Sequence, residues 1–240
     1  MRARETLDSY DKIFYEEMSK SSNSSARFLV PFLKKNLEFN SVIDIGCGDG
    51  QFVSEFIRNG ISDIKGLEGD WILGSLNQRN SSWLQIADLT NELTFDKRFD
   101  LAICLEVAEH LEEKYADTFI GNLVKASDLI FFSAAIPGQG GTNHINLQYP
   151  DYWAIKFAEH GYYMEWDPRD LLNGKRGVAP WYQQNCLLYQ KSTEISKVMT
   201  TPRTVFHPDI FPDQRNLFYK LRKFPMRLTR RIVRLLVREE

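Results

Sequence analysis

The chain has 240 residues, of which 43% are hydrophobic and 26% charged, which is enough for one domain with a buried core and additional segments. No apolar run approaches the roughly 20 residues that cross a bilayer, and the first residues lack the apolar core of a signal peptide, so we expect a cytoplasmic protein. The three cysteines, Cys47, Cys104 and Cys186, are odd in number and far apart, which argues against a disulfide framework and against a paired-cysteine zinc site.

The net charge of -2 hides an uneven distribution along the chain. Residues 211–240 contain nine Lys and Arg against three Asp and Glu, which leaves 21 against 29 in the preceding body. An acidic body argues against a nucleic-acid partner, because proteins that follow a phosphate backbone present basic side chains to it. Only the basic tail is a candidate for contact with polyanions.

Ahead of the main domain, the apolar pattern predicts two helices. Apolar residues recur at helical spacing over residues 6–20 and again over residues 28–33, and the serine-rich run over residues 21–25 breaks the pattern between them. We therefore expect helical additions over residues 1–38.

Short apolar runs at the length of buried strands come next. They are residues 42–45, 64–68, 83–86, 101–105 and 129–133. Helix-like segments separate them, such as residues 52–57, which end at Asn59-Gly60, and residues 114–126. This alternation predicts the α/β class, with a doubly wound, mostly parallel sheet.

The last predicted elements form the edge of that sheet. A helix ends near Gly161, and two strand-like runs follow at residues 162–166 and 185–190, with a Gly- and Pro-rich connection but no predicted helix between them. Two strands joined in this way favour an antiparallel edge hairpin. The sequence thus predicts a seven-stranded sheet over residues 39–192, followed by a linker and a basic tail over residues 193–240.

A glycine-rich turn, Gly46-Cys47-Gly48-Asp49-Gly50, lies between the first strand and its helix. Glycines there allow the backbone to turn tightly and to approach a ligand closely. A dinucleotide fingerprint, G-x-G-x-x-G, would need glycine at position 51, where this chain has Gln51. The spacing G-x-G-x-G therefore disfavours a nicotinamide-dependent oxidoreductase.

Four acidic residues follow or flank the first two strands: Asp44, Asp49, Glu68 and Asp70. They would repel a pyrophosphate but suit a sulfonium, an ammonium and ribose hydroxyls. Glu68 lies 22 residues after Gly46, where an acidic side chain can accept both hydrogen bonds from a ribose diol. Asp88, after the third strand, could accept from an adenine amino group, with a solvated loop aspartate as the alternative.

These motifs and residues 99–111 resemble the successive cofactor motifs of class I S-adenosylmethionine (SAM)-dependent methyltransferases, over roughly residues 40–190. The resemblance implies a Rossmann-like fold and SAM as the cofactor. It implies that Asp44 and the glycine-rich turn hold the methionine part, Glu68 the ribose and Asp88 the adenine. The implied cofactor-binding residues are Asp44, Gly46, Cys47, Gly48, Gly50, Glu68, Asp88, Leu89, Leu105 and Glu106.

Methyl transfer displaces a carbon already activated by sulfonium, so the protein mainly aligns the acceptor and removes the proton of a hydroxyl. The sequence Glu106-Val107-Ala108-Glu109-His110 places two carboxylates and an imidazole within about one helical turn. It resembles the metal-binding motif of quinone-biosynthesis O-methyltransferases and small-RNA 2′-O-methyltransferases. That resemblance implies a magnesium-type ion, with Glu106, Glu109, His110 and His144 as ligands. Similar Glu-His pairs also occur in methyltransferases without a metal, so both alternatives stay open.

His144 lies in a long polar loop, residues 135–146, that follows the fifth strand, where α/β active sites form. It is our candidate catalytic base, with a solvent-facing histidine as the alternative. The loop and residues 148–153 resemble bacterial glycan-biosynthesis methyltransferases. We therefore expect O-methylation of a small molecule or glycan precursor. A quinone-like or RNA 2′-hydroxyl acceptor and a non-catalytic SAM-binding regulator are the alternatives.

The basic tail has apolar residues at helical spacing over residues 215–238, interrupted by Pro225. Such a helix can lie on an anionic surface, which predicts peripheral contact with the inner face of a membrane. A helix docked on the acidic body and a contact between subunits are the alternatives, and the sequence leaves the oligomeric state open.

Overall fold

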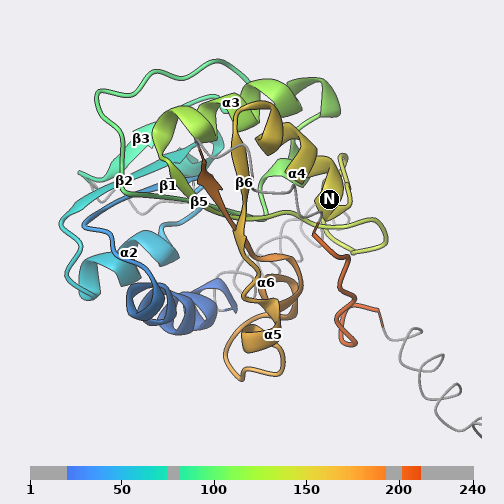
Figure 1. The fold of residues 1–240 in the computed structure, drawn as a ribbon. Helices are drawn as coiled ribbons and strands as arrows, with labels where there is room; N and C mark the ends of the chain where they lie inside the picture. The colour runs from blue at the N-terminus through green and yellow to red at the C-terminus, as the bar shows by residue number, and fades with distance from the viewer. Residues whose placement is uncertain (1–20, 75–81, 193–201, 212–240) are drawn as a thin grey trace, which may run out of the picture. The chain divides into compact units, whose positions relative to one another are not determined.

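The computed structural model describes residues 21–74, 82–192 and 202–211. At its centre is a seven-stranded sheet with the strand order β3-β2-β1-β4-β5-β7-β6 (Figure 1). The strands are β1 (Ser41–Ile45), β2 (Asp63–Glu68), β3 (Leu84–Ile86), β4 (Leu101–Leu105), β5 (Leu129–Ser133), β6 (Tyr162–Trp166) and β7 (Leu187–Lys191). The first five pair in parallel, and β7 is antiparallel to β5 and β6. The predicted mostly parallel sheet is confirmed.

The central strands of the sheet are continuous apolar runs in the sequence because they are buried. Every residue of β1 and of β4 is buried, as expected for parallel strands covered by helices on both faces. The register pairs Asp44 with Gly66 on β2 and with Ile103 on β4. The carboxyl ends of these three strands therefore meet at one edge, where α/β proteins bind their ligands.

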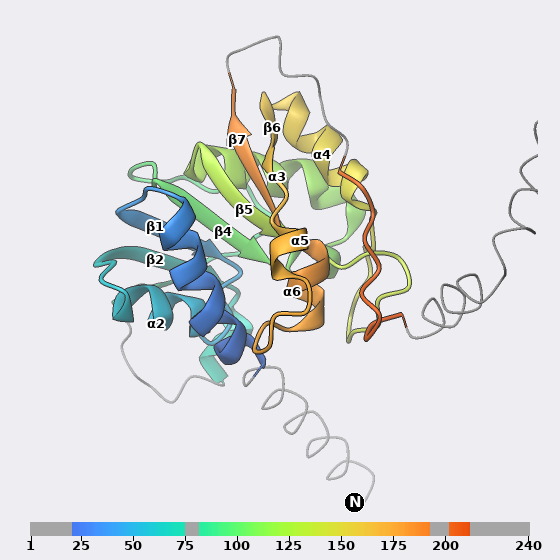
Figure 2. The same cartoon turned by 60° about the horizontal axis from the view of Figure 1, so that its bottom comes forward.

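Helices cover both faces of the sheet. They are the helix over residues 21–36, α2 (Gln51–Arg58), α3 (Ala116–Ala126), α4 (Pro150–Glu159), α5 (Arg169–Leu172) and α6 (Pro180–Asn185), with the short 3-10 helices η1 (Asp70–Gly74), η2 (Ala108–His110) and η3 (Glu113–Tyr115). Helices α3 and α4 bury Phe119 and Phe157 in one core cluster, against Phe132 of β5. The helix over residues 21–36, α2 and α6 supply the other cluster, on the opposite face (Figure 2).

The serine-rich run is helical, contrary to the sequence-based prediction. Residues 21–36 form one helix, and Ser25 lies buried within it. Its Oγ donates to the carbonyl of Ser21 at 2.7 Å and accepts the main-chain N–H of Ala179 at 2.9 Å. The hydroxyl thus bonds to the helix itself and to a distant loop, so the serine joins two elements instead of ending one. The helix predicted over residues 6–20 lies outside the described residues.

The edge hairpin is antiparallel as predicted, but its two strands are not joined directly. The short helices α5 and α6 lie between β6 and β7. Asn185, which the sequence placed in the last strand, ends α6. Because α5 and α6 have four and six residues, they are too short to show a helical period in the sequence.

Contacts within the chain divide it into two compact units, residues 1–205 and residues 206–240. In the described part of the second unit, the main-chain N–H groups of Ile210 and Phe211 donate to the carbonyl of His207, at 3.0 and 2.9 Å. The predicted basic amphipathic helix lies outside the described residues. Within the described part of the chain, no helix is both long and apolar enough to cross a bilayer.

Candidate cofactor and catalytic site

The glycine-rich turn joins β1 to α2 in a conformation that requires glycine. Gly46, Gly48 and Gly50 have φ values of 83°, 52° and 78°, which cost other residues about 1–2 kcal/mol each. The main-chain N–H groups of Gly46 and Cys47 donate to the carbonyl of Leu67, at 2.8 and 3.0 Å. The turn is therefore held against the end of β2, where Glu68 follows.

The three glycines of this turn differ in their surroundings. A Cβ atom on Gly46 would lie 2.3 Å from the side chain of Val107, and one on Gly50 would lie 2.4 Å from the ring of Trp83. A Cβ atom on Gly48 would meet no described atom within 4 Å. Packing thus accounts for the first and the last glycine, and Gly48 is the point where a ligand can approach the turn closely.

Glu68, the predicted ribose ligand, lies against the glycine-rich turn. Its buried carboxylate accepts hydrogen bonds from the main-chain N–H groups of Gly48 and Gly69, at 2.7 and 2.9 Å, and from Nε1 of Trp71, at 3.0 Å. These donors hold both carboxylate oxygens beside the open glycine. A ribose diol that reached Glu68 would compete with the indole donor of Trp71, a residue that is 56% exposed.

The inner part of this site carries excess negative charge. Asp44 is buried, and burial together with the charge of Glu68 raises its pKa well above the ordinary value. Burial, followed by the charges of Asp44 and Glu68, also raises the pKa of the Cys47 thiol, which therefore stays protonated. A cationic ligand placed here would offset this repulsion, as the sulfonium and ammonium groups of SAM can.

Asp88 and Leu89 follow β3 at the same edge of the sheet, because the main-chain N–H of Ala87 donates to the carbonyl of Glu68 at 2.9 Å. The exposed Asp88 carboxylate accepts the main-chain N–H of Thr90 at 2.9 Å and its hydroxyl at 2.6 Å, and these bonds lower the pKa of Asp88. Leu89 is buried in the core. The contact of Asp88 with adenine stays a prediction, because its carboxylate already stabilises this turn.

Glu106 follows β4 with an unusual backbone conformation. Its φ is 56°, a left-handed value that costs a non-glycine residue about 1–3 kcal/mol. Its N–H donates to the carbonyl of Ser133 at 3.0 Å, and its carboxylate accepts Nε2 of Gln139 at 2.8 Å and Nδ2 of Asn185 at 3.0 Å. We call Glu106, Gln139, Gln184 and Asn185 the amide network.

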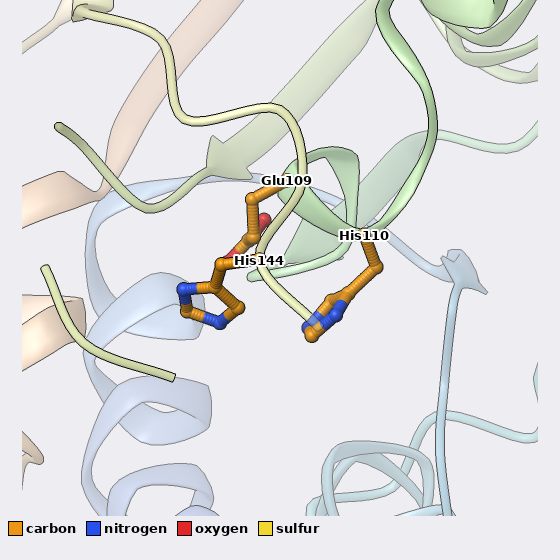
Figure 3. Close-up of side chains that lie close together, drawn as sticks. All are labelled: Glu109, His110 and His144. Atoms are coloured by element: carbon orange, nitrogen blue, oxygen red, sulfur yellow. The ribbon is translucent and has the colours of Figure 1, made fainter. Parts of the chain in front are cut away.

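Glu109, His110 and His144 come together just beyond Glu106 (Figure 3). One carboxylate oxygen and one nitrogen of each imidazole lie within 4.8 Å of one another. Glu109 is fully buried, and neither of its carboxylate oxygens has a hydrogen-bond partner of good geometry in the described part of the chain. The fourth predicted ligand, Glu106, is not in this group, because the amide network holds its carboxylate.

The loop after β5 is fixed so that His144 faces Glu109. The carbonyl of Glu109 accepts the main-chain N–H groups of Ile145 and Asn146, at 2.9 and 3.0 Å. A Cβ atom on Gly141 would lie 2.1 Å from Cε1 of His144, so only glycine leaves room for the imidazole. The loop thus places His144 beside η2, although the two are distant in the sequence.

Burial controls the protonation of this cluster. It lowers the pKa of His110, and it lowers the pKa of His144 with a further contribution from the charge of His110. Burial and the charge of Glu106 raise the pKa of Glu109. Neutral imidazoles are competent both as metal ligands and as proton acceptors, whereas Glu109 is held in its protonated form unless a cation favours the carboxylate.

Sequence reasoning missed the amide network apart from Glu106, and it missed Trp71. Gln184 and Asn185 lie in a helix that has no sequence signal, and side-chain amides carry no motif by themselves. Trp71 directly follows Glu68-Gly69-Asp70, and an aromatic residue so near a predicted ribose ligand was the signal that could have identified it.

Residues 17–166 match a family described as a methyltransferase domain. The match covers more than half of the chain, so the protein belongs to this family, within the class of Rossmann-like SAM-dependent methyltransferases. The fold is shared by Streptomyces venezuelae DesVI, with 13% identity, a TM-score of 0.57, and coverage of 78% of this chain and 98% of that one.

A second similar structure is magnesium protoporphyrin IX methyltransferase (ChlM) of Synechocystis, crystallised with S-adenosylhomocysteine, at 16% identity and a TM-score of 0.51. The match covers 78% of this chain and 94% of that one. Among curated proteins, a ubiquinone biosynthesis O-methyltransferase of Rickettsia bellii is 33% identical over 88 residues, or 35% of this chain. That match spans only 36% of the relative's length.

Proposed function

We propose that the protein transfers the methyl group of SAM to a hydroxyl of an uncharged small molecule, with a divalent cation held by Glu109, His110 and His144. One observation carries this proposal. The fully buried Glu109 carboxylate has no hydrogen-bond partner of good geometry among the described residues, and two imidazole nitrogens lie within 4.8 Å of it. Burial and the charge of Glu106 disfavour the ionised form of this group, and a cation between these atoms would stabilise that form.

The donor set indicates which cation fits. One carboxylate and two neutral imidazoles suit borderline ions such as Mn²⁺, Fe²⁺, Co²⁺ or Zn²⁺. Mg²⁺ prefers an all-oxygen environment with several waters. We therefore propose a transition-metal ion in place of the magnesium-type ion that the sequence suggested. Such an ion, when bound, would orient the acceptor hydroxyl and make it more acidic.

The protein's own residues supply the other parts of the reaction. The acidic pair Asp44 and Glu68, beside the open Gly48, favours the cationic cofactor over an anionic ligand. If no cation is bound, the neutral His144 is placed to accept the proton of the hydroxyl instead. Both routes lead to O-methylation, and they differ in their response to a chelator.

The surroundings of the cluster favour an uncharged acceptor. Residues 134–149, which carry His144, contain no Lys, Arg, Asp or Glu. Ile145 and Tyr149 in this loop are 61% and 45% exposed. A phosphate-bearing acceptor would call for a cationic side chain here, whereas a phenolic or isoprenoid-like molecule would cover the two apolar side chains. The similarity to curated ubiquinone biosynthesis O-methyltransferases supports a quinone-like phenol ahead of a glycan precursor or RNA.

Metal binding by the chelator-treated protein tests the proposal. Calorimetric titration with Mn²⁺ should show one site, and Glu109→Gln and His110→Ala should weaken it at least about tenfold. The matched control is His160→Ala, because His160 is exposed at the end of α4 and lies outside the cluster. Absence of Mn²⁺, Co²⁺ and Zn²⁺ binding would overturn the metal-assisted mechanism, and His144 would then have to act as the base.

A further inference from the structure

Every member of the amide network bonds to at least one other member. Nε2 of Gln139 and Nδ2 of Asn185 donate to the Glu106 carboxylate, at 2.8 and 3.0 Å. Nδ2 of Asn185 and Nε2 of Gln184 donate to Oε1 of Gln139, each at 3.0 Å. Gln184 also donates to Oδ1 of Asn185 at 3.0 Å. The three amide residues are at most 7% exposed, so these bonds form away from bulk water.

The network connects segments that are distant in the sequence. Glu106 follows β4, Gln139 lies in the loop after β5, and Gln184 and Asn185 end α6. The side chain of Glu106 therefore holds the loop at Gln139. Glu109 lies three residues after Glu106, and its main-chain carbonyl holds the same loop at Ile145 and Asn146.

His144 lies between these two attachment points. A loop fixed at both ends of a short segment leaves its central side chains little freedom, so the hold at Gln139 helps to set where the imidazole points. The Glu106 carboxylate accepts from Gln139 and Asn185, and it is also close enough to Glu109 to raise the pKa of that group. Its hydrogen bond from Gln139 is the one that reaches the loop of His144.

We propose that Glu106 is a positioning residue, which acts through Gln139 to hold His144 against Glu109. This inference rests on the proposed function, in which His144 and Glu109 work together. It gives the Glu106 side chain a different role from the cofactor or metal ligand that the sequence predicts.

An exchange of donor and acceptor within the network tests this role. Glu106→Gln removes the carboxylate, and Gln139→Glu places two carboxylates against each other, so each single change breaks the pairing. The double variant E106Q/Q139E reverses the pair. Its carboxylate at position 139 accepts from position 106, from Gln184 and from Asn185, and the net charge is unchanged.

We expect each single variant to lower kcat at least about tenfold while the Kd for SAM stays within about threefold of the wild-type value. The double variant should recover kcat to within about threefold. Gln183→Leu is the matched control, because Gln183 is an adjacent buried amide of α6 that accepts the N–H of Gly174 and donates to the carbonyl of Val178. It should lower the melting temperature without this loss of kcat.

A double variant no better than the worse single variant would overturn the proposal, because the carboxylate would then be needed at position 106 itself. Adding E106Q to His144→Ala separates the proposal from the proposed function. If Glu106 acts through His144, the added change lowers kcat no further. An additive loss would overturn the positioning role alone, whereas a normal kcat in His144→Ala would overturn the proposed function.

Discussion

The imidazole rings of His110 and His144 meet edge to face, with centroids 4.8 Å apart and planes at 79°. One ring belongs to η2, after β4, and the other to the loop after β5. The contact exists because η2 binds the loop through its main chain and because Gly141 leaves space for the second ring. Two neighbouring strands of a parallel sheet therefore build the centre of the site together.

Replacing His144 separates cofactor binding from the chemical step. His144→Ala should lower kcat by roughly 10²–10⁴, since the loss of a base or of a metal ligand acts on the transition state. The Kd for SAM, measured by calorimetry, should stay nearly unchanged, because none of the predicted cofactor contacts involves this loop. Near-normal turnover with the true acceptor would show that His144 is neither the base nor a metal ligand.

Removing the Glu68 carboxylate should weaken the binding of the cofactor. Glu68→Ala should reduce the affinity for SAM and S-adenosylhomocysteine by about 1.5–3 kcal/mol, the usual contribution of a hydrogen bond to a charged group. Calorimetry with both ligands measures the change. Equal affinities in the wild type and the variant would show that Glu68 does not bind the ribose.

Trp71 should report cofactor binding through its fluorescence, because its indole N–H donates to Glu68 at 3.0 Å. SAM that engages Glu68 should change this emission, and Trp71→Phe should abolish most of the change. Trp181→Phe is the control, since Trp181 packs beside Tyr182 on α6. A fluorescence change that survives in Trp71→Phe would place the perturbed indole elsewhere.

The buried Asp44 should make the cofactor-free protein less stable as pH rises. Its folded pKa lies above the ordinary 3.8, so the folded state binds more protons above that pH, and stability falls as the group ionises. Asp44→Asn should therefore raise the melting temperature at neutral pH and flatten its decline as pH rises above 3.8, while weakening SAM binding.

Asp100 provides a control, because its pKa is lowered in the folded protein whereas that of Asp44 is raised. The main-chain N–H of Asn40 is the largest cause that lowers its pKa, with further contributions from Ser41, so its ionised form stabilises the fold. Stability from such a group is present above the ordinary pKa and is lost as pH falls. Asp100→Asn should lower the melting temperature at neutral pH. An Asp44→Asn protein that melts like the wild type throughout would contradict the first expectation.

The basic tail should be dispensable for the cofactor, because the predicted SAM contacts end at Glu106 and the sheet ends at Lys191. A chain lacking residues 211–240 should keep its Kd for SAM. If the tail binds membranes, only the full chain should sediment with anionic vesicles, and salt should weaken that binding. If it instead covers the acidic body or joins subunits, deletion should change the melting temperature or the oligomer mass. Equal sedimentation of both proteins would exclude the membrane role.

The sheet could be predicted from sequence because buried parallel strands read as apolar runs, as in residues 101–105, and because glycine-rich turns mark their ends. The contact of Glu68 with Gly48 was predictable for the same reason, since the ends of adjacent parallel strands meet. The grouping of Glu109 with His110 was predictable because the two residues are adjacent in the sequence.

The remaining parts depend on tertiary contacts. Ser25 looks like a helix breaker until its hydroxyl bonds to Ala179. Glu106 looks like a metal ligand until Asn185 folds back onto it from 79 residues away, in a helix without a sequence period. Local patterns show which chemical groups are present, whereas long-range hydrogen bonds decide which of them face the ligand.

The most direct measurement is methyl transfer from radiolabelled SAM to an uncharged catechol, with chelator-treated protein before and after Mn²⁺ is restored. Transfer should be lost on metal removal, return with Mn²⁺ or Co²⁺ and stay absent in His110→Ala. Little transfer to a short RNA is expected under the same conditions. Full transfer in the presence of a chelator, with an unaffected His110→Ala protein, would contradict metal-assisted O-methylation.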